Sequence, residues 1–284
     1  MTFGEWVIER VSDFLAKPTG RYEQRGWNDF DRLKQVIRKG DVLLVEGDQR
    51  VSALIKYLTQ SSWSHAALYV GDELLKRGGA LADDTRQRFG DEAEFLVIEA
   101  LSEGVAVSPL MKYVDFNVRL CRPHLLRSDH LDTILDDAIE AIGWRYDVRN
   151  VTDLALFLLR SALRPHCRHD LARLGSNTVT EVICTSLLGR LFHKVQFPVL
   201  PSVTFPEGVE PGLPAEQRSF PKLLRRNREP YAALFRKRHP TLLTPRDFDL
   251  SPYFDVVKFN LIEGKKFDYT RMEWEDDAPA EEVA

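Results

Sequence analysis

The stretch Ser61-Ser-Trp-Ser-His-Ala-Ala-Leu-Tyr-Val-Gly71 begins with a short polar run and continues from His65 as an apolar segment typical of a strand. Successive side chains of a strand point to opposite faces of its sheet, so we expect Ala66 and Leu68 on one face and His65 and Tyr69 on the other. The small residues beside His65 leave room for another element to come close. His65 is therefore a candidate general base at the start of a strand.

The composition is that of a soluble globular protein. The chain has 284 residues, of which 44% are hydrophobic and 29% charged, a length near the upper limit for one domain. Its net charge of -4 provides no basic surface, so nucleic acid is not an expected partner. Three cysteines at wide spacing (Cys121, Cys167 and Cys184) do not predict a disulfide framework.

The N-terminal segment predicts neither a signal peptide nor a membrane span. Charged residues such as Glu5 and Glu9 interrupt its apolar positions, and no apolar run approaches the roughly 18 residues that a span requires. Residues 3–16 predict an amphipathic helix that packs on the protein body or, as the alternative, lies on a membrane surface. We expect a cytoplasmic protein, with peripheral membrane contact through this helix as the alternative.

The hydrophobic pattern predicts an α+β fold with a meander of antiparallel strands. Strands are expected at 42–46, 65–70, 95–100, 105–107 and 114–122, and helices at 50–58, 129–142, 152–163 and within 177–194. The polar residues 72–93 are expected to form a surface excursion.

Beyond residue 196 the composition changes, since ten of the fifteen prolines lie between Pro198 and Pro252 and exclude long regular elements. We expect four parts along the chain. They are an N-terminal helix and linker (1–39), a catalytic domain (40–195), a proline-rich wrap with a late strand (196–262) and an acidic tail (263–284).

Three side chains form a candidate catalytic set. Cys184 lies where an extended stretch turns into a helix, and a helix N-terminus together with a nearby cationic imidazole can lower a thiol pKa from about 8.5 to roughly 3.5–7.5. If Val70 stands opposite Glu94 in neighbouring antiparallel strands, His65 faces Glu99 directly, and this carboxylate can orient the imidazole. A register slip of one residue would separate the two side chains. Each residue alone is more often structural; the three together indicate a thiol hydrolase.

Five short motifs occur in a distinctive order. They are Gly40-Asp-Val-Leu-Leu44, Thr59-Gln-Ser-Ser-Trp-Ser-His65, Val97-Ile-Glu-Ala100, Gly143-Trp-Arg-Tyr-Asp147 and Val182-Ile-Cys-Thr-Ser186. Over residues 40–195 this order resembles the YiiX/YebB-type cysteine hydrolases, which are circularly permuted papain-like enzymes related to the NlpC peptidases and to lecithin:retinol acyltransferase-like proteins.

The resemblance implies a permuted papain-like (NlpC-like) fold in which an antiparallel sheet packs against the helix that carries the cysteine. It also implies a nucleophile at Cys184, a base at His65 and an orienting carboxylate at Glu99. Thr185-Ser186 departs from the Ser-Glu that the family often has after the cysteine, which puts any role of that glutamate in doubt.

The expected activity is thiol-dependent hydrolysis, of the amidase or peptidase type, through an acyl-thioester intermediate. The substrate class is peptide-like or an acyl lipid. Two alternatives stay open: a lipid acyl hydrolase or acyltransferase at a membrane surface, and a catalytically silent binding module of the same fold.

Other residues near these motifs have weaker assignments. Tyr146 and Trp63 are candidates for lining the substrate cleft. No metal or organic cofactor is expected, because His166-Cys-Arg-His169 offers three metal ligands where a zinc site needs about four, and a solvated turn is the simpler interpretation.

Overall fold

The computed structural model describes residues 17–20, 22–25, 28–101, 103–146, 181–182, 184–204 and 234–259. The predicted helices at 3–16 and 152–163, Asp147, the 166–169 cluster and the acidic tail lie outside these ranges. Within them, no helix has the length and apolar character needed to cross a membrane.

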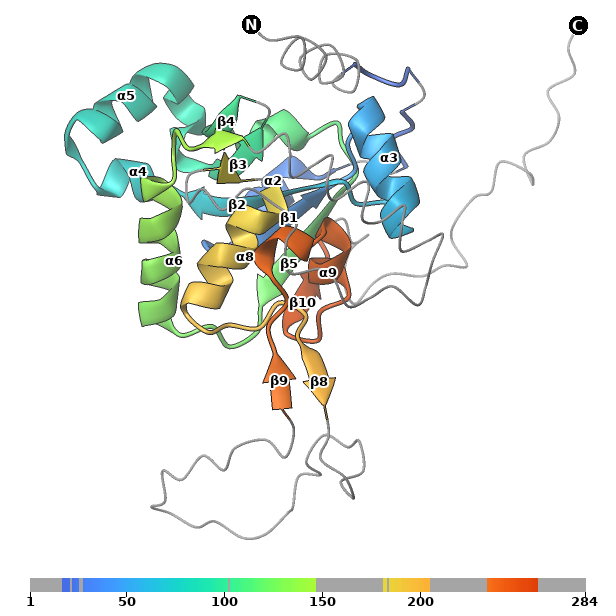
Figure 1. The fold of residues 1–284 in the computed structure, drawn as a ribbon. Helices are drawn as coiled ribbons and strands as arrows, with labels where there is room; N and C mark the ends of the chain where they lie inside the picture. Colours follow the sequence, from blue (N-terminus) through green and yellow to red (C-terminus); the bar gives the residue numbers. More distant parts are fainter. Residues whose placement is uncertain are drawn as a thin grey trace, which may run out of the picture.

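A six-stranded antiparallel sheet forms the centre of the described structure (Figure 1), in the order β10-β5-β1-β2-β3-β4. Its strands are β1 (Val42–Val45), β2 (His65–Gly71), β3 (Leu96–Leu101), β4 (Gly104–Pro109), β5 (Val118–Pro123) and β10 (Phe254–Val257). The predicted α+β class is confirmed. The late strand β10 pairs with β5, so a segment from the proline-rich region forms one edge of the main sheet.

Helices and short turns connect and cover these strands. The helices are α2 (Phe30–Val36), α3 (Arg50–Thr59), α4 (Glu73–Lys76), α5 (Gly79–Phe89), α6 (Ser128–Glu140), α8 (Cys184–Lys194) and α9 (Pro245–Asp249). The 3-10 turns are η1 (Gly90–Glu94), η2 (Leu110–Tyr113) and η4 (Pro240–Leu242), and the short strand pairs are β6 (Arg145–Tyr146) with β7 (Glu181–Val182) and β8 (Ser202–Thr204) with β9 (Leu234–Arg236).

The segment 72–93, which was expected to form a surface excursion, contains the helical elements α4, α5 and η1. Leu74, Ala82 and Ala93 are buried, at 0–2% exposure, and anchor the three elements to the protein body. These apolar positions are few and widely spaced among charged residues, so the segment shows little helical periodicity in the sequence.

The two faces of the sheet carry separate hydrophobic clusters. Ala66 and Leu68 of β2 lie in the cluster that contains α6 and α8, whereas Ala67 and Tyr69 lie in the cluster that contains α2 and η2. The predicted division of β2 into two faces is therefore confirmed. Figure 1 shows α6 and α8 side by side on one face of the sheet.

Helix α8 is fixed against both the sheet and the segment after η4. Its apolar stripe of Leu187, Leu188 and Leu191 is buried, at 1–4% exposure. The hydroxyl of Thr185 donates to the carbonyl oxygen of Leu243 at 2.6 Å. A Cβ at Gly189 would lie 2.5 Å from the Cδ1 methyl of Leu243, so a larger residue here would require the Leu243 side chain to shift. The N-terminal residue of α8 is thereby held at a defined place beside the sheet.

The assumed pairing of β2 with β3 is wrong by two residues. Tyr69 pairs with Val97 and Leu68 with Ile98, so continuing the same offset places Glu99 opposite Ala67 rather than His65. A bulge between Tyr69 and Gly71 also shifts the register at the far end of the strand. A shift of two residues preserves the face to which each side chain points. Residue 99 therefore still shares a face with residue 65, as its diagonal neighbour.

Candidate active site

His65 and Glu99 meet at the end of the sheet where β2 begins. The imidazole Nε2 lies 2.5 Å from Oε2 of Glu99. The Glu99 side chain is fully buried, at 0% exposure, while that of His65 is 19% exposed. The structure thus brings together the two residues that the sequence predicted to be partners, through a diagonal contact rather than a directly opposed one.

Cys184 is the first residue of α8, and its sulfur shares a hydrogen bond with the imidazole of His65. Backbone N–H groups of Ala66 and Thr185 also donate to this sulfur. Because Nε2 of His65 faces Glu99, Nδ1 is the ring nitrogen left for the thiol. Cysteine, imidazole and carboxylate therefore form one hydrogen-bonded chain.

The surroundings favour an ionised thiolate and a protonated imidazole. Burial opposes the charge on His65, but its hydrogen bonds to Cys184 and then Glu99 outweigh this cost and raise its pKa from 6.5 to about 10. Burial likewise opposes the Cys184 thiolate, yet His65 and the two backbone donors lower the pKa of the thiol. The pKa of Glu99 is also lowered: burial acts against its charge, and His65 and Lys112 overcome it.

Two residues that the sequence did not single out complete the surroundings of Glu99. Lys112 Nζ lies 2.8 Å from Oε1, and the hydroxyl of Tyr113 donates to Oε2. Both belong to η2, which follows β4. The sequence indicated these partners only indirectly. A glutamate at an inward position of an apolar strand requires a cation or several hydrogen-bond donors, and Lys112-Tyr113 follows the next strand along the chain.

One family model agrees with this architecture. Residues 36–157 match a family model described as permuted papain-like amidase enzyme, YaeF/YiiX, C92 family. The predicted resemblance to the permuted papain-like amidases is confirmed. The matched segment contains His65 and Glu99 and ends before Cys184. The position of Cys184 beside these two residues therefore rests on the structure of α8 and not on the family match. The match supports a hydrolase of the amidase or peptidase type.

A solved structure is also similar to this chain. It is described as the crystal structure of metalloprotein yiiX from Escherichia coli O157:H7, with a TM-score of 0.44 at 13% identity, and the alignment covers 78% of this chain and 97% of that one. No curated protein matches the chain. In the ranges that the structure describes here, no three His, Cys, Asp or Glu residues are grouped so that they could hold a metal ion.

The remaining candidate site residues have different surroundings. Trp63 is 8% exposed; its indole N–H donates to Asp249 Oδ2 at 3.1 Å, and the guanidinium of Arg119 lies 5.0 Å from its ring centroid. These contacts account for Trp63 as a packing residue, and its role in lining a cleft stays a prediction. Tyr146 is the last residue of β6, and its side chain is outside the described part of the structure.

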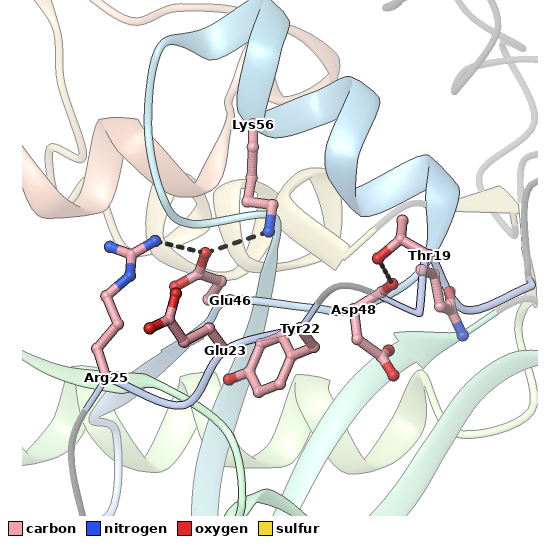
Figure 2. Close-up of a pocket in the computed structure, with 8 residues that line it drawn as sticks. Thr19, Tyr22, Glu23, Arg25, Glu46, Asp48 and Lys56 are labelled. Atoms are coloured by element: carbon pink, nitrogen blue, oxygen red, sulfur yellow. Dashed lines mark hydrogen bonds and ion pairs between the residues drawn. The ribbon is translucent and has the colours of Figure 1, made fainter.

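A polar pocket of about 140 Å³ lies near the start of β2 (Figure 2). Its lining residues are Thr19, Tyr22, Glu23, Arg25, Glu46, Asp48, Gln49 and Lys56. The backbone N–H of Gly47, between two of these residues, donates to the hydroxyl of Ser64 at 2.9 Å, and Ser64 immediately precedes His65. The pocket is therefore at the same end of the sheet as the candidate catalytic residues.

The pocket is built around the buried carboxylate of Glu46. Arg25 Nη2 lies 2.9 Å and Lys56 Nζ 3.1 Å from Oε1, and Figure 2 shows both side chains converging on it. Asn117 Nδ2 donates to Oε2 at 3.0 Å. No sequence pattern indicates this pocket, because its residues come from three separate segments and none of them belongs to a recognisable motif.

Proposed function

We propose that the protein cleaves an amide bond with Cys184 as nucleophile and His65 as the acid and base. The observation that carries this proposal is the hydrogen-bonded chain from Cys184 through His65 to the buried Glu99. Amidase chemistry is the general assignment of the family; the cysteine nucleophile and the bond type are our own inference.

The reaction begins from the thiolate and the imidazolium. The Cys184 sulfur attacks the carbonyl carbon, and the electron pair of the C=O bond moves to oxygen. Backbone N–H groups at the start of α8 are suitable donors to this oxyanion, because the first N–H groups of a helix have no partner within it. His65 then gives its proton to the leaving nitrogen, the C=O bond re-forms and the C–N bond breaks, which releases the amine and leaves an acyl-thioester and a neutral imidazole.

Water completes the cycle. The neutral imidazole takes a proton from a water molecule, the resulting hydroxide attacks the thioester carbon, and the C–S bond breaks to release the acid. Thiolate and imidazolium are restored. Glu99 acts through His65, by orienting the ring and stabilising its charge, and is therefore a positioning residue.

The polar pocket lies at the same end of the sheet as the proposed nucleophile, although Cys184, His65 and Glu99 are not among its lining residues. It has carboxylate, guanidinium, ammonium and phenol groups in its lining and no aliphatic side chain, so it matches hydrogen-bonding groups better than an acyl chain.

Selective alkylation tests the proposed nucleophile without knowledge of the substrate. Folded protein is treated with iodoacetamide near pH 7, and mass spectrometry follows each cysteine over time. Burial raises the pKa of Cys121 to about 12, so this residue is an internal reference for an unreactive thiol. We expect Cys184 to react at least about 100-fold faster than Cys121, because only the thiolate is nucleophilic. Equal rates for Cys184, Cys121 and Cys167 would disprove the activated thiolate.

The bond type needs a separate experiment. Peptide-like and lipid-like electrophilic probes are offered side by side to wild-type protein, to Cys184→Ala and to the matched control Cys121→Ala. We expect labelling by the peptide-like probe, its loss in Cys184→Ala and its retention in the control. Preferential labelling by the lipid-like probe would overturn the amide assignment while leaving the nucleophile in place.

A further inference from the structure

Lys112 is held in one direction by several contacts around Glu99. Its Nζ lies 2.8 Å from Oε1 of Glu99 and 3.4 Å from the hydroxyl oxygen of Ser108. It also lies 5.2 Å from the ring centroid of Tyr113. The side chain remains 37% exposed, so it lies between solvent and the buried carboxylate.

The two oxygens of Glu99 have different partners. Oε2 accepts from Tyr113 and contacts His65, whereas Oε1 contacts Lys112. Of these partners, Tyr113 is a neutral donor, since burial and then the adjacent Glu99 charge raise its pKa. The charged partners are therefore the imidazolium and the ammonium group.

The charge of His65 is temporary in the proposed reaction. Once the imidazolium has protonated the leaving nitrogen, Glu99 has lost one of its two cationic partners. A buried carboxylate without a counter-charge is unfavourable and tends to take up a proton. A protonated Glu99 would no longer stabilise the imidazolium that must form again during hydrolysis of the thioester.

We propose that Lys112 is a positioning residue, and that its ammonium group is the permanent counter-ion of Glu99 while His65 alternates between imidazolium and imidazole. This inference rests on the proposed function. The titratable groups that face the site are Cys184 from α8, His65 from β2, Glu99 from β3, and Lys112 and Tyr113 from η2. With Lys112 present, thiolate, imidazolium, carboxylate and ammonium alternate in sign and sum to zero.

Removal of the ammonium charge leaves this buried group of charges with a net charge of -1. A more negative site disfavours the Cys184 thiolate, so the thiol should ionise at higher pH. We expect the midpoint of the Cys184 alkylation rate against pH to rise by roughly one unit in Lys112→Met, with an unchanged rate on the high-pH plateau. A purely structural loss would lower the plateau or leave the midpoint where it was.

Three further variants separate charge from other effects. Lys112→Gln keeps an N–H donor without the charge and should shift the midpoint as Lys112→Met does, which preserves the test if the methionine variant fails to fold. Lys112→Arg keeps the positive charge and should have the same midpoint as the wild-type protein. Lys76→Met removes one positive charge from an exposed position on α4 and should leave the midpoint unchanged.

The outcomes distinguish this inference from the proposed function. If iodoacetamide does not select Cys184 in the wild-type protein, the proposed nucleophile fails. If Cys184 is selected but folded Lys112→Gln has the same midpoint as Lys76→Met, the role of Lys112 is overturned and the proposed nucleophile stands.

Discussion

Replacement of Glu99 by glutamine tests the charge relation on which the candidate site depends. Glu99→Gln keeps the size of the side chain and removes the negative charge whose Oε2 lies 2.5 Å from Nε2 of His65. Both charges are spread over several atoms, so we take their centres to be about 4 Å apart, where two unit charges interact by about 4 kcal/mol at an effective dielectric constant of 20. One pKa unit corresponds to about 1.36 kcal/mol, so this attraction sets an upper limit of about three units.

The expected fall in the pKa of His65 is smaller than this limit. The hydrogen bond to the Cys184 sulfur, which also raises the imidazole pKa, remains in the variant. Lys112 is partly exposed and can turn towards water when its partner is lost, which reduces its repulsion of the imidazolium. We therefore expect the pKa of His65 to fall from about 10 by about two units.

Nuclear magnetic resonance of protein with labelled histidine provides the assay. The Cε1–H signal of His65, identified by its absence in His65→Asn, is followed against pH in wild type and in Glu99→Gln. Glu140→Gln removes the same charge from an exposed position of α6 and is the matched control. An unchanged His65 titration in Glu99→Gln would refute the argument that the buried carboxylate stabilises the imidazolium.

Three more outcomes follow from the same contacts. The rate of hydrolysis should fall at low pH, as Cys184 is protonated below its lowered pKa. It should also fall at high pH, through about pH 10, as His65 loses its proton. An alkaline fall near pH 6.5 would contradict the raised pKa of the imidazole. Tyr113→Phe removes a hydroxyl donor to Glu99 and should lower the free energy of unfolding, measured by urea denaturation, by about 1.5–3 kcal/mol. An unchanged free energy of unfolding would mean that this hydrogen bond is not formed. The ring of Phe192 is fully buried and contacts three other phenylalanines. Phe192→Ala should therefore lower the free energy of unfolding by about 3–5 kcal/mol, and a loss below about 1 kcal/mol would contradict this packing.

The strand faces and the kind of chemistry could be predicted from the sequence. The alternation along β2 places His65 on the face of Ala67 and Tyr69, and the structure agrees. The motif order predicted the permuted papain-like fold, which the family match confirms. The roles of Cys184, His65 and Glu99 remain predictions, although the structure places their side chains in one hydrogen-bonded chain.

The offset between strands could not be predicted in the same way. Pairing registers that differ by two residues present the same faces, so alternation leaves several of them equally acceptable. The bulge near Val70 also shifts the pairing register between β2 and β3 by one residue. Whether His65 meets Glu99 directly or diagonally therefore depended on how the whole sheet packs.

Local sequence specified which face the residues of β2 occupy and that a thiol, an imidazole and a carboxylate were available, because period-two alternation and residue chemistry are local properties. The tertiary structure alone decided that Lys112 and Tyr113 share Glu99, and that β10 forms the sheet edge beside β5. Both features depend on segments that come together only after folding. A buried carboxylate needs partners from wherever the backbone brings them, and no local pattern of sequence specifies that position.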